Sequence, residues 1–181
     1  MHALLRSRAT SVRLLKFFAS LAALTTLAAV TAVAGQANSD DPSWGAAEPK
    51  FNLRVILRPV EGAEDNGFGL VKFRQPVDAD KIVYLDVRVR HLAPNHSYYL
   101  QRATDSIVNN DCTGANWLTL GQGPVAQAIT TDERGTGHAN LFRDLAAIPV
   151  GTQFDIHFRL IDALTSAVVL ESACYQFTVR Q

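Results

Sequence analysis

Basic residues are sparse in this sequence beyond its first 34 positions. Only three lysines remain there, and the ten arginines are scattered singly. The first 34 residues hold four of the 17 basic residues and none of the 17 acidic ones, which leaves 13 bases against 17 acids and a net charge of −4. A mildly acidic chain without a basic cluster argues against nucleic acid, and against an anionic membrane surface, as the partner.

Long apolar runs are also lacking, apart from one near the start. Residues 1–16 carry four basic residues and no acid, and residues 17–34 carry no charge and end in small residues. This order is typical of a signal peptide. We expect the signal peptide, residues 1–34, to be removed by cleavage before Gly35. A second candidate cleavage site, also preceded by small residues, lies before Asn38.

The alternative is an uncleaved membrane anchor. The uncharged stretch has 18 residues, from 17 to 34, which is short for a hydrocarbon core about 30 Å thick. Its many alanines and threonines drive insertion only weakly. We therefore expect a secreted or periplasmic protein with no membrane span after signal cleavage.

Helical periodicity is absent from the rest of the chain. Residues 35–49 have no period and are rich in small and turn residues, so we expect a flexible lead-in. From residue 50 to 181, apolar and polar residues alternate in short stretches, most clearly in residues 82–90. Alternation at period two is typical of strands with one buried face. The pattern predicts an all-β domain over 50–181, an antiparallel Greek-key β-sandwich of about eight strands.

The chain has only two cysteines. Cys112 lies in a long polar loop expected over residues 105–116, and Cys174 opens the last strand. A zinc site needs more ligands, and a redox pair usually has C-x-x-C spacing. Because well-separated cysteines in an exported chain tend to pair, we predict a structural disulfide that contributes about 4 kcal/mol in the loop-entropy model.

Catalytic motifs are missing as well. No serine lies in a G-x-S-x-G elbow, and no acidic run has the spacing of a calcium loop. Asp155, His157 and Arg159 alternate on one outward strand face, where the aspartate could orient the histidine as a proton carrier. No nucleophile can be placed beside them, so we interpret the row as a solvent-exposed strand face. We expect no catalytic residue and no cofactor.

One region resembles the copper/zinc superoxide dismutase family and, more loosely, other immunoglobulin-like sandwiches. Residues 92–101 (LAPNHSYYLQ) are similar to that family's Leu-x-Pro-Gly turn and the His-rich strand after it. Cys112 then lies in the following loop, and Ala173-Cys174 opens the final strand. The resemblance implies a β-sandwich and, independently of the compartment argument, a bond between Cys112 and Cys174.

The residues at that family's metal positions are different here. Tyr99 and Gln101 stand where two copper ligands would be, and no histidine occurs between Ser97 and Gly137, where the zinc loop would lie. Glu171 replaces an arginine that attracts the anionic substrate in that family. A redox copper site needs several converging imidazoles, so we expect no bound copper or zinc and no dismutase activity.

Three aromatic residues are candidates for a binding surface: Tyr98, Tyr99 and Trp117. Exposed tyrosine and tryptophan are common anchors of protein and carbohydrate binding, and of two consecutive strand residues one must point outward. We therefore predict an exported, non-enzymatic binding or envelope module whose partner is a protein or a glycan. The alternative is a metal-binding protein or an enzyme on a dismutase-like scaffold with a site that no motif marks.

Overall fold

A computed structural model describes residues 51–61 and 66–181, and in these residues all regular secondary structure is β-strand. The all-β prediction is therefore confirmed, whereas the expected signal peptide (1–34) and lead-in (35–49) lie outside the described residues. No helix in the described ranges has the length and apolar character needed to cross a membrane. The strands are β1 (Asn52–Pro59), β2 (Phe68–Arg74), β3 (Ile82–Arg90), β4 (Ser97–Asp105), β5 (Leu118–Thr119), β6 (Gly121–Gln122), β7 (Val125–Ala126), β8 (Ile129–Thr130), β9 (Gly137–Asp144), β10 (Gln153–Asp162), β11 (Val168–Ser172) and β12 (Tyr175–Thr178).

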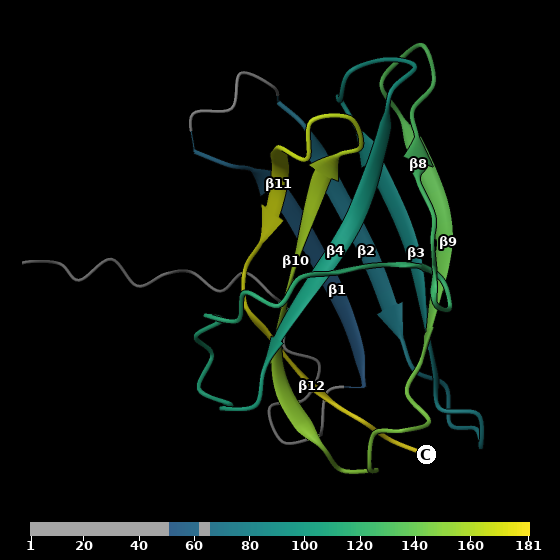
Figure 1. Cartoon of the computed structure of the whole chain (residues 1–181), viewed down its shortest axis with the longest axis vertical. Helices are drawn as coiled ribbons and strands as arrows, with labels where there is room; N and C mark the ends of the chain where they lie inside the picture. Colours follow the sequence, from purple (N-terminus) through teal and green to yellow (C-terminus); the bar gives the residue numbers. More distant parts are fainter. Residues whose placement is uncertain (1–50, 62–65) are drawn as a thin grey trace, which may run out of the picture. The chain divides into compact units, whose positions relative to one another are not determined.

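These strands form one sheet that curls into a nearly closed barrel. Seven of them follow in the order β4-β10-β11-β1-β2-β3-β9, and each neighbouring pair is antiparallel. β12 continues along the same edge of β10 that β11 uses. In Figure 1, β4 and β10 lie in front of β1 and β2, so the sheet folds back over its own inner face.

The segment from β5 to β8 closes the gap between β4 and β9. β5 pairs with β4, and β6 pairs with β9. Further along the chain, β8 returns to β4, and Thr131 bridges to Gly137 at the start of β9. Both edges of the main sheet therefore find partners, which satisfies backbone groups that an open sheet would expose.

Alternating apolar residues fill the barrel. On β3, the side chains of Val83, Leu85, Val87 and Val89 are at most 2% exposed, as the period-two pattern of this segment predicted. The other long strands contribute residues in the same phase, such as Leu100 on β4. Because the inward residues come from every side of the barrel, they form one continuous core.

The eight-stranded Greek-key sandwich expected from the sequence is not confirmed. The structure has a single barrel-like sheet, and within the described ranges it has twelve strands. The additional strands, β5 to β8, are two residues long each. Two residues are too few to show a period-two pattern, so the sequence could not reveal the segment that closes the sheet.

The disulfide between Cys112 and Cys174 is confirmed. The two Cα atoms lie 5.4 Å apart, and the bond joins positions 62 residues apart in the chain. Cys174 lies between β11 and β12, and Cys112 lies in the loop after β4. The bond therefore ties this loop to the last strands of the barrel.

Asp162 joins two turns at the end of β10. Its Oδ1 accepts hydrogen bonds from the backbone amides of Leu164 and Thr165, both at 2.8 Å. Its Oδ2 accepts a hydrogen bond from Nε2 of His96, in the turn before β4, at 2.6 Å. The backbone amide of Thr165 is the largest cause that lowers the pKa of Asp162 to about 2, and the His96 bond adds to this effect.

We predict that Asp162 makes stability pH-dependent in the acid range. The folded pKa lies below the unfolded value of about 3.9, so the carboxylate stabilises the fold above that pH. This contribution is lost as the pH falls from about 4 through about 2. Asp162→Asn should cost about 1 kcal/mol at neutral pH, and the difference from wild type should shrink as the pH falls through that window. Urea unfolding at a series of pH values measures this effect.

Asp80→Asn, in the turn between β2 and β3, is the matched control. It removes one carboxylate without touching the Asp162 turn. An equal acid dependence in the Asp162→Asn and Asp80→Asn variants would contradict the prediction.

Candidate functional site

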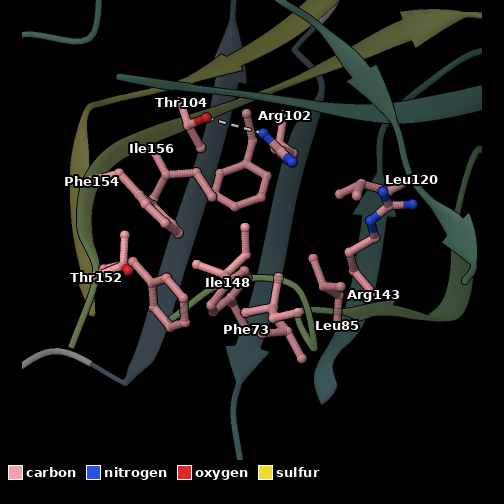
Figure 2. Close-up of a pocket in the computed structure, with 14 residues that line it drawn as sticks. Phe73, Leu85, Arg102, Thr104, Leu120, Arg143, Ile148, Thr152, Phe154 and Ile156 are labelled. Atoms are coloured by element: carbon pink, nitrogen blue, oxygen red, sulfur yellow. Dashed lines mark hydrogen bonds between the residues drawn. The ribbon is translucent and has the colours of Figure 1, made fainter. Parts of the chain in front are cut away.

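A cavity of about 250 Å³ lies inside one end of the barrel (Figure 2). Its walls come from β2, β3, β4, β9, β10 and β12 and from the loop of residues 145–152. Ten of its fourteen lining residues are apolar, and the other four are Arg102, Thr104, Arg143 and Thr152. The cavity is therefore an apolar space with a few polar groups, which is the usual composition of a small-molecule site.

Four phenylalanine rings make up much of the wall. Phe73 lies 4.7 Å from Phe177 and 6.0 Å from Phe158 between ring centroids, and both pairs are edge-to-face. Phe154 lies 5.5 Å from Phe177. Such contacts are favourable beyond the apolar area that they bury, so they give the cavity a firmly packed side.

Arg102 on β4 and Arg143 on β9 bring two positive charges to the cavity. Both side chains are half-buried. Nη1 of Arg102 donates to the hydroxyl of Thr104 at 3.1 Å, and Nη1 of Arg143 donates to the carbonyl of Gly123 at 3.4 Å. Burial, followed by the positive charge of Arg143, lowers the pKa of Arg102. Both guanidinium groups line the same cavity, so they bring like charges to one half-buried space.

Neither arginine has an acidic partner among the described residues. The ion pairs within residues 51–61 and 66–181 join Arg88 to Asp86, His138 to Asp86, and His96 to Asp162. Buried or half-buried arginines are normally paired, because a desolvated charge is costly without a counter-charge. Two neighbouring unpaired guanidinium groups at an apolar cavity thus form a positive site without an internal anion.

Neither arginine was among the residues predicted from the sequence, although the strand pattern contains a signal for both. On β4, Tyr98, Leu100 and Arg102 share the inward phase, and on β9 Leu141 and Arg143 do so. A charged residue in the buried phase of a strand is unusual. Applied to these strands, this rule would have marked both arginines as candidates.

The structure separates the three aromatic residues expected to form a binding surface. Tyr98 is 3% exposed and belongs to the core, where its hydroxyl accepts a hydrogen bond from the amide of Ala93. Tyr99 points outward on β4 and is half-buried. Trp117 is also half-buried and lies in the segment before β5. Tyr98 therefore cannot contribute to a surface, and only Tyr99 and Trp117 remain partly accessible.

Trp117 takes part in a stack on the outer face of β10. The guanidinium carbon of Arg159 lies 4.0 Å from the centre of the indole, and the His157 ring centre lies 4.5 Å from it. Nε of Arg159 also donates to Oε1 of Gln101 at 2.7 Å. The indole is thus held against the strand by a cation–π contact and by ring packing.

The outward row on β10 is not the solvent-exposed face that its alternation suggested. Asp155 is fully buried, and His157 and Arg159 are half-buried. The reason is tertiary, because the loop after β4 crosses the outer side of β10 and β4 (Figure 1). The row serves as an attachment site for this loop.

Two aspartates hold the loop through its backbone amides. Oδ2 of Asp155 accepts from the amides of Asn109 and Asn110 at 2.8 and 2.7 Å. Oδ2 of Asp105 accepts from the amides of Thr113 and Gly114, both at 2.8 Å. Asp105 and Asp155 stand opposite each other on paired strands, so one spot on the sheet anchors both halves of the loop.

Gly114 allows the second half of the loop to approach the strand closely. A Cβ at this position would lie 2.8 Å from the carbonyl oxygen of Thr104, a backbone atom that cannot easily move. Its carbonyl accepts a hydrogen bond from Nε2 of His157 at 3.0 Å. His157 is therefore engaged in holding the loop.

We predict that Asp155→Ala releases the loop. It would leave the amides of Asn109 and Asn110 without acceptors, at a cost of about 2 kcal/mol. Hydrogen exchange at these two amides should become faster, and the free energy of unfolding should fall by this amount. Asp111→Ala, an exposed acid in the same loop, is the control. Unchanged exchange in the Asp155→Ala variant would show that other contacts hold the loop.

No group of three or more histidine, cysteine, aspartate or glutamate side chains suited to a metal ion occurs in the described ranges. No family model and no curated protein matches this chain. The cavity and its two arginines are therefore the features of the described residues that bear on function.

Proposed function

We propose that this protein is an exported, non-catalytic binding domain that holds a small apolar ligand in the cavity at the end of its barrel. The observation that carries the proposal is the cavity itself, which is lined mostly by apolar side chains and backed by packed phenylalanine rings. A rigid apolar space of this kind gains free energy when an apolar group leaves water and enters it.

The size of the cavity limits the ligand. Its volume of about 250 Å³ lies just below the ~300–1,000 Å³ of typical ligand pockets. It therefore suits one short chain or one ring system, and not a lipid with two long chains.

The lining favours binding over catalysis. Its polar members are two arginines and two threonines, and within the described residues no carboxylate, histidine or cysteine lines the cavity. General acid–base chemistry near neutral pH usually relies on such groups. A domain that binds and releases its ligand unchanged is the simplest account of this lining.

Export is part of the proposal. It rests on the leader pattern of residues 1–34, and the disulfide between Cys112 and Cys174 supports it because such bonds persist in oxidising compartments. Binding of a protein or glycan at Tyr99 and Trp117 and the description of the barrel as a Greek-key sandwich remain predictions.

The binding proposal is tested with decanol as an uncharged apolar probe. Isothermal titration of the purified protein should show saturable binding with a negative change in heat capacity, the mark of apolar burial. Ile148→Trp should abolish binding by filling the cavity from the loop of residues 145–152. Leu164→Trp is the control, because Leu164 is 83% exposed in the turn after β10.

Either of two results would overturn this proposal. The first is no saturable binding of decanol to the wild-type protein. The second is equal binding to the Ile148→Trp and Leu164→Trp variants, which would place the probe outside the cavity.

We also predict that the purified protein holds no stoichiometric copper or zinc and has no superoxide dismutase activity. The reason is the chemistry of Tyr99 and Gln101, neither of which offers the imidazole nitrogen that copper favours. Elemental analysis after dialysis against a weak chelator measures the metal content. Copper bound one-to-one, with dismutation that a His157→Ala variant lacks, would favour the alternative of a metal enzyme.

A further inference from the structure

Building on the proposed binding function, we infer that the ligand is a single-chain amphiphile with an acidic head group, and that Arg102 and Arg143 hold this head while the apolar tail occupies the cavity. The head is defined by its chemistry, a carboxylate or a phosphate, and the experiment below distinguishes the two. The inference rests on the placement of the two arginines.

The arginines reach the cavity from opposite edges of the main sheet. Arg102 belongs to β4 and Arg143 to β9, and the segment containing β5 and β6 joins these two strands. Leu120, between β5 and β6, lines the cavity with them. Closure of the barrel therefore brings together two charges that are 41 positions apart in the sequence.

The cavity is polarised as a result. In Figure 2, Arg102 and Arg143 lie on one side, and Phe154 and Thr152 lie on the opposite side. Apolar rings and aliphatic side chains line the space between them. A molecule with one charged end and one apolar end matches this arrangement, because its charged end would contact the arginines and its apolar end would contact the apolar lining.

The charge of the proposed head group follows from the like charges of the two arginines. The two half-buried guanidinium groups line one cavity, where like charges repel, and neither forms an ion pair with a described residue. An anion placed between them would be attracted by both and would offset their repulsion. A cationic or neutral head would leave that repulsion in place.

The hydrogen bonds of the arginines leave donors for the ligand. Each guanidinium has five N–H donors in a planar fork. One from Arg102 is used by Thr104, and one from Arg143 by the carbonyl of Gly123. These bonds orient the two groups, and the remaining N–H groups can donate to the oxygens of a carboxylate or phosphate.

The experiment compares three probes with the same ten-carbon tail: decanol, decanoate and decyl phosphate. Titration of the wild-type protein should show that at least one anionic probe binds tenfold or more tightly than decanol. The tighter of the two anions identifies the head group. In Arg102→Gln and Arg143→Gln variants, the preference over decanol should fall to about threefold or less.

Arg134→Gln is the matched control. It removes one positive charge from an exposed turn between β8 and β9 and should leave the preference unchanged. The ligand-free Arg143→Gln variant should keep the Tm of the wild type, because the substitution also removes a repulsion. If one glutamine variant fails to fold, the other still tests the inference, and Arg143→Lys keeps the charge while removing the planar fork.

The outcomes separate this inference from the proposed function. Equal affinity for decanol and both anions would overturn the acidic head group and leave the binding domain intact. An anion preference that survives both glutamine variants would also overturn it. Failure of decanol to bind the wild-type protein would overturn the proposed function itself.

Discussion

Replacing Cys112 and Cys174 together with serine is expected to lower the free energy of unfolding by about 4 kcal/mol. The disulfide joins positions 62 residues apart, and its loss enlarges the conformational freedom of the unfolded chain. Total stabilities of single domains are about 5–15 kcal/mol, so this change would remove a large share. Guanidinium unfolding, followed by tryptophan fluorescence, measures it.

The same substitution should have a local effect that chain entropy alone does not explain. Cys112 lies two residues after Asn110. The backbone amides of Asn109 and Asn110 donate hydrogen bonds to the buried carboxylate of Asp155. We expect faster hydrogen exchange in the loop of residues 106–117 even under conditions where the barrel stays folded. Wild-type protein treated with a reductant is the control and should match the double variant.

A loss smaller than about 1 kcal/mol would contradict the entropic account. It would mean that the unfolded chain already holds this loop in a compact form, because the model assumes a freely moving loop.

Phe177→Ala is expected to cost about 3–5 kcal/mol. The Phe177 ring is 1% exposed and packs against Phe73 and Phe154 with centroids 4.7 and 5.5 Å away. Removing it deletes these contacts and leaves a void that the surrounding strands fill only in part. Thermal and denaturant unfolding measure the loss.

The control for this variant is Phe68→Ala. Phe68 is half-buried on β2 and lies under the Arg90 guanidinium, 4.7 Å from it. Its removal opens no interior void, so we expect a cost of about 1 kcal/mol. Similar losses in both variants would show that the phenylalanine wall is not closely packed.

Phe177→Ala also bears on the binding proposal. Since Phe177 lines the cavity, its truncation should enlarge the space beside the ligand. At a temperature where the variant is folded, dodecanol should gain affinity relative to decanol. A fixed preference for the shorter chain would place the tail elsewhere in the cavity.

The strands with clear alternation were predictable because a period of two indicates both the strand and which of its side chains are buried. In residues 82–90, every second residue is a valine or leucine, and those side chains are the ones that β3 buries. The disulfide was predictable for a chemical reason, since only two cysteines exist and a leader pattern precedes them. Neither inference needs knowledge of which strands are neighbours.

The faces of individual residues were harder to predict. Asp155 lies on the outward phase of β10, yet it is fully buried because a loop from another part of the chain covers it. Tyr98 and Tyr99 are adjacent and chemically alike, and only the phase of β4 decides that Tyr98 enters the core. Alternation distinguishes two faces of a strand, but it does not say what covers the outer one.

The sequence by itself determined the all-β class, the inward phase of the most regularly alternating strand, β3, and the pairing of the cysteines. All three follow from local period and composition, which need no partner strand. The tertiary structure alone decided the closure of the barrel by the short strands β5 to β8 and the meeting of Arg102 with Arg143. The physical reason is that strand pairing joins distant segments through backbone hydrogen bonds, which every residue type except proline offers alike. The packing of the whole core therefore decides which strands become neighbours.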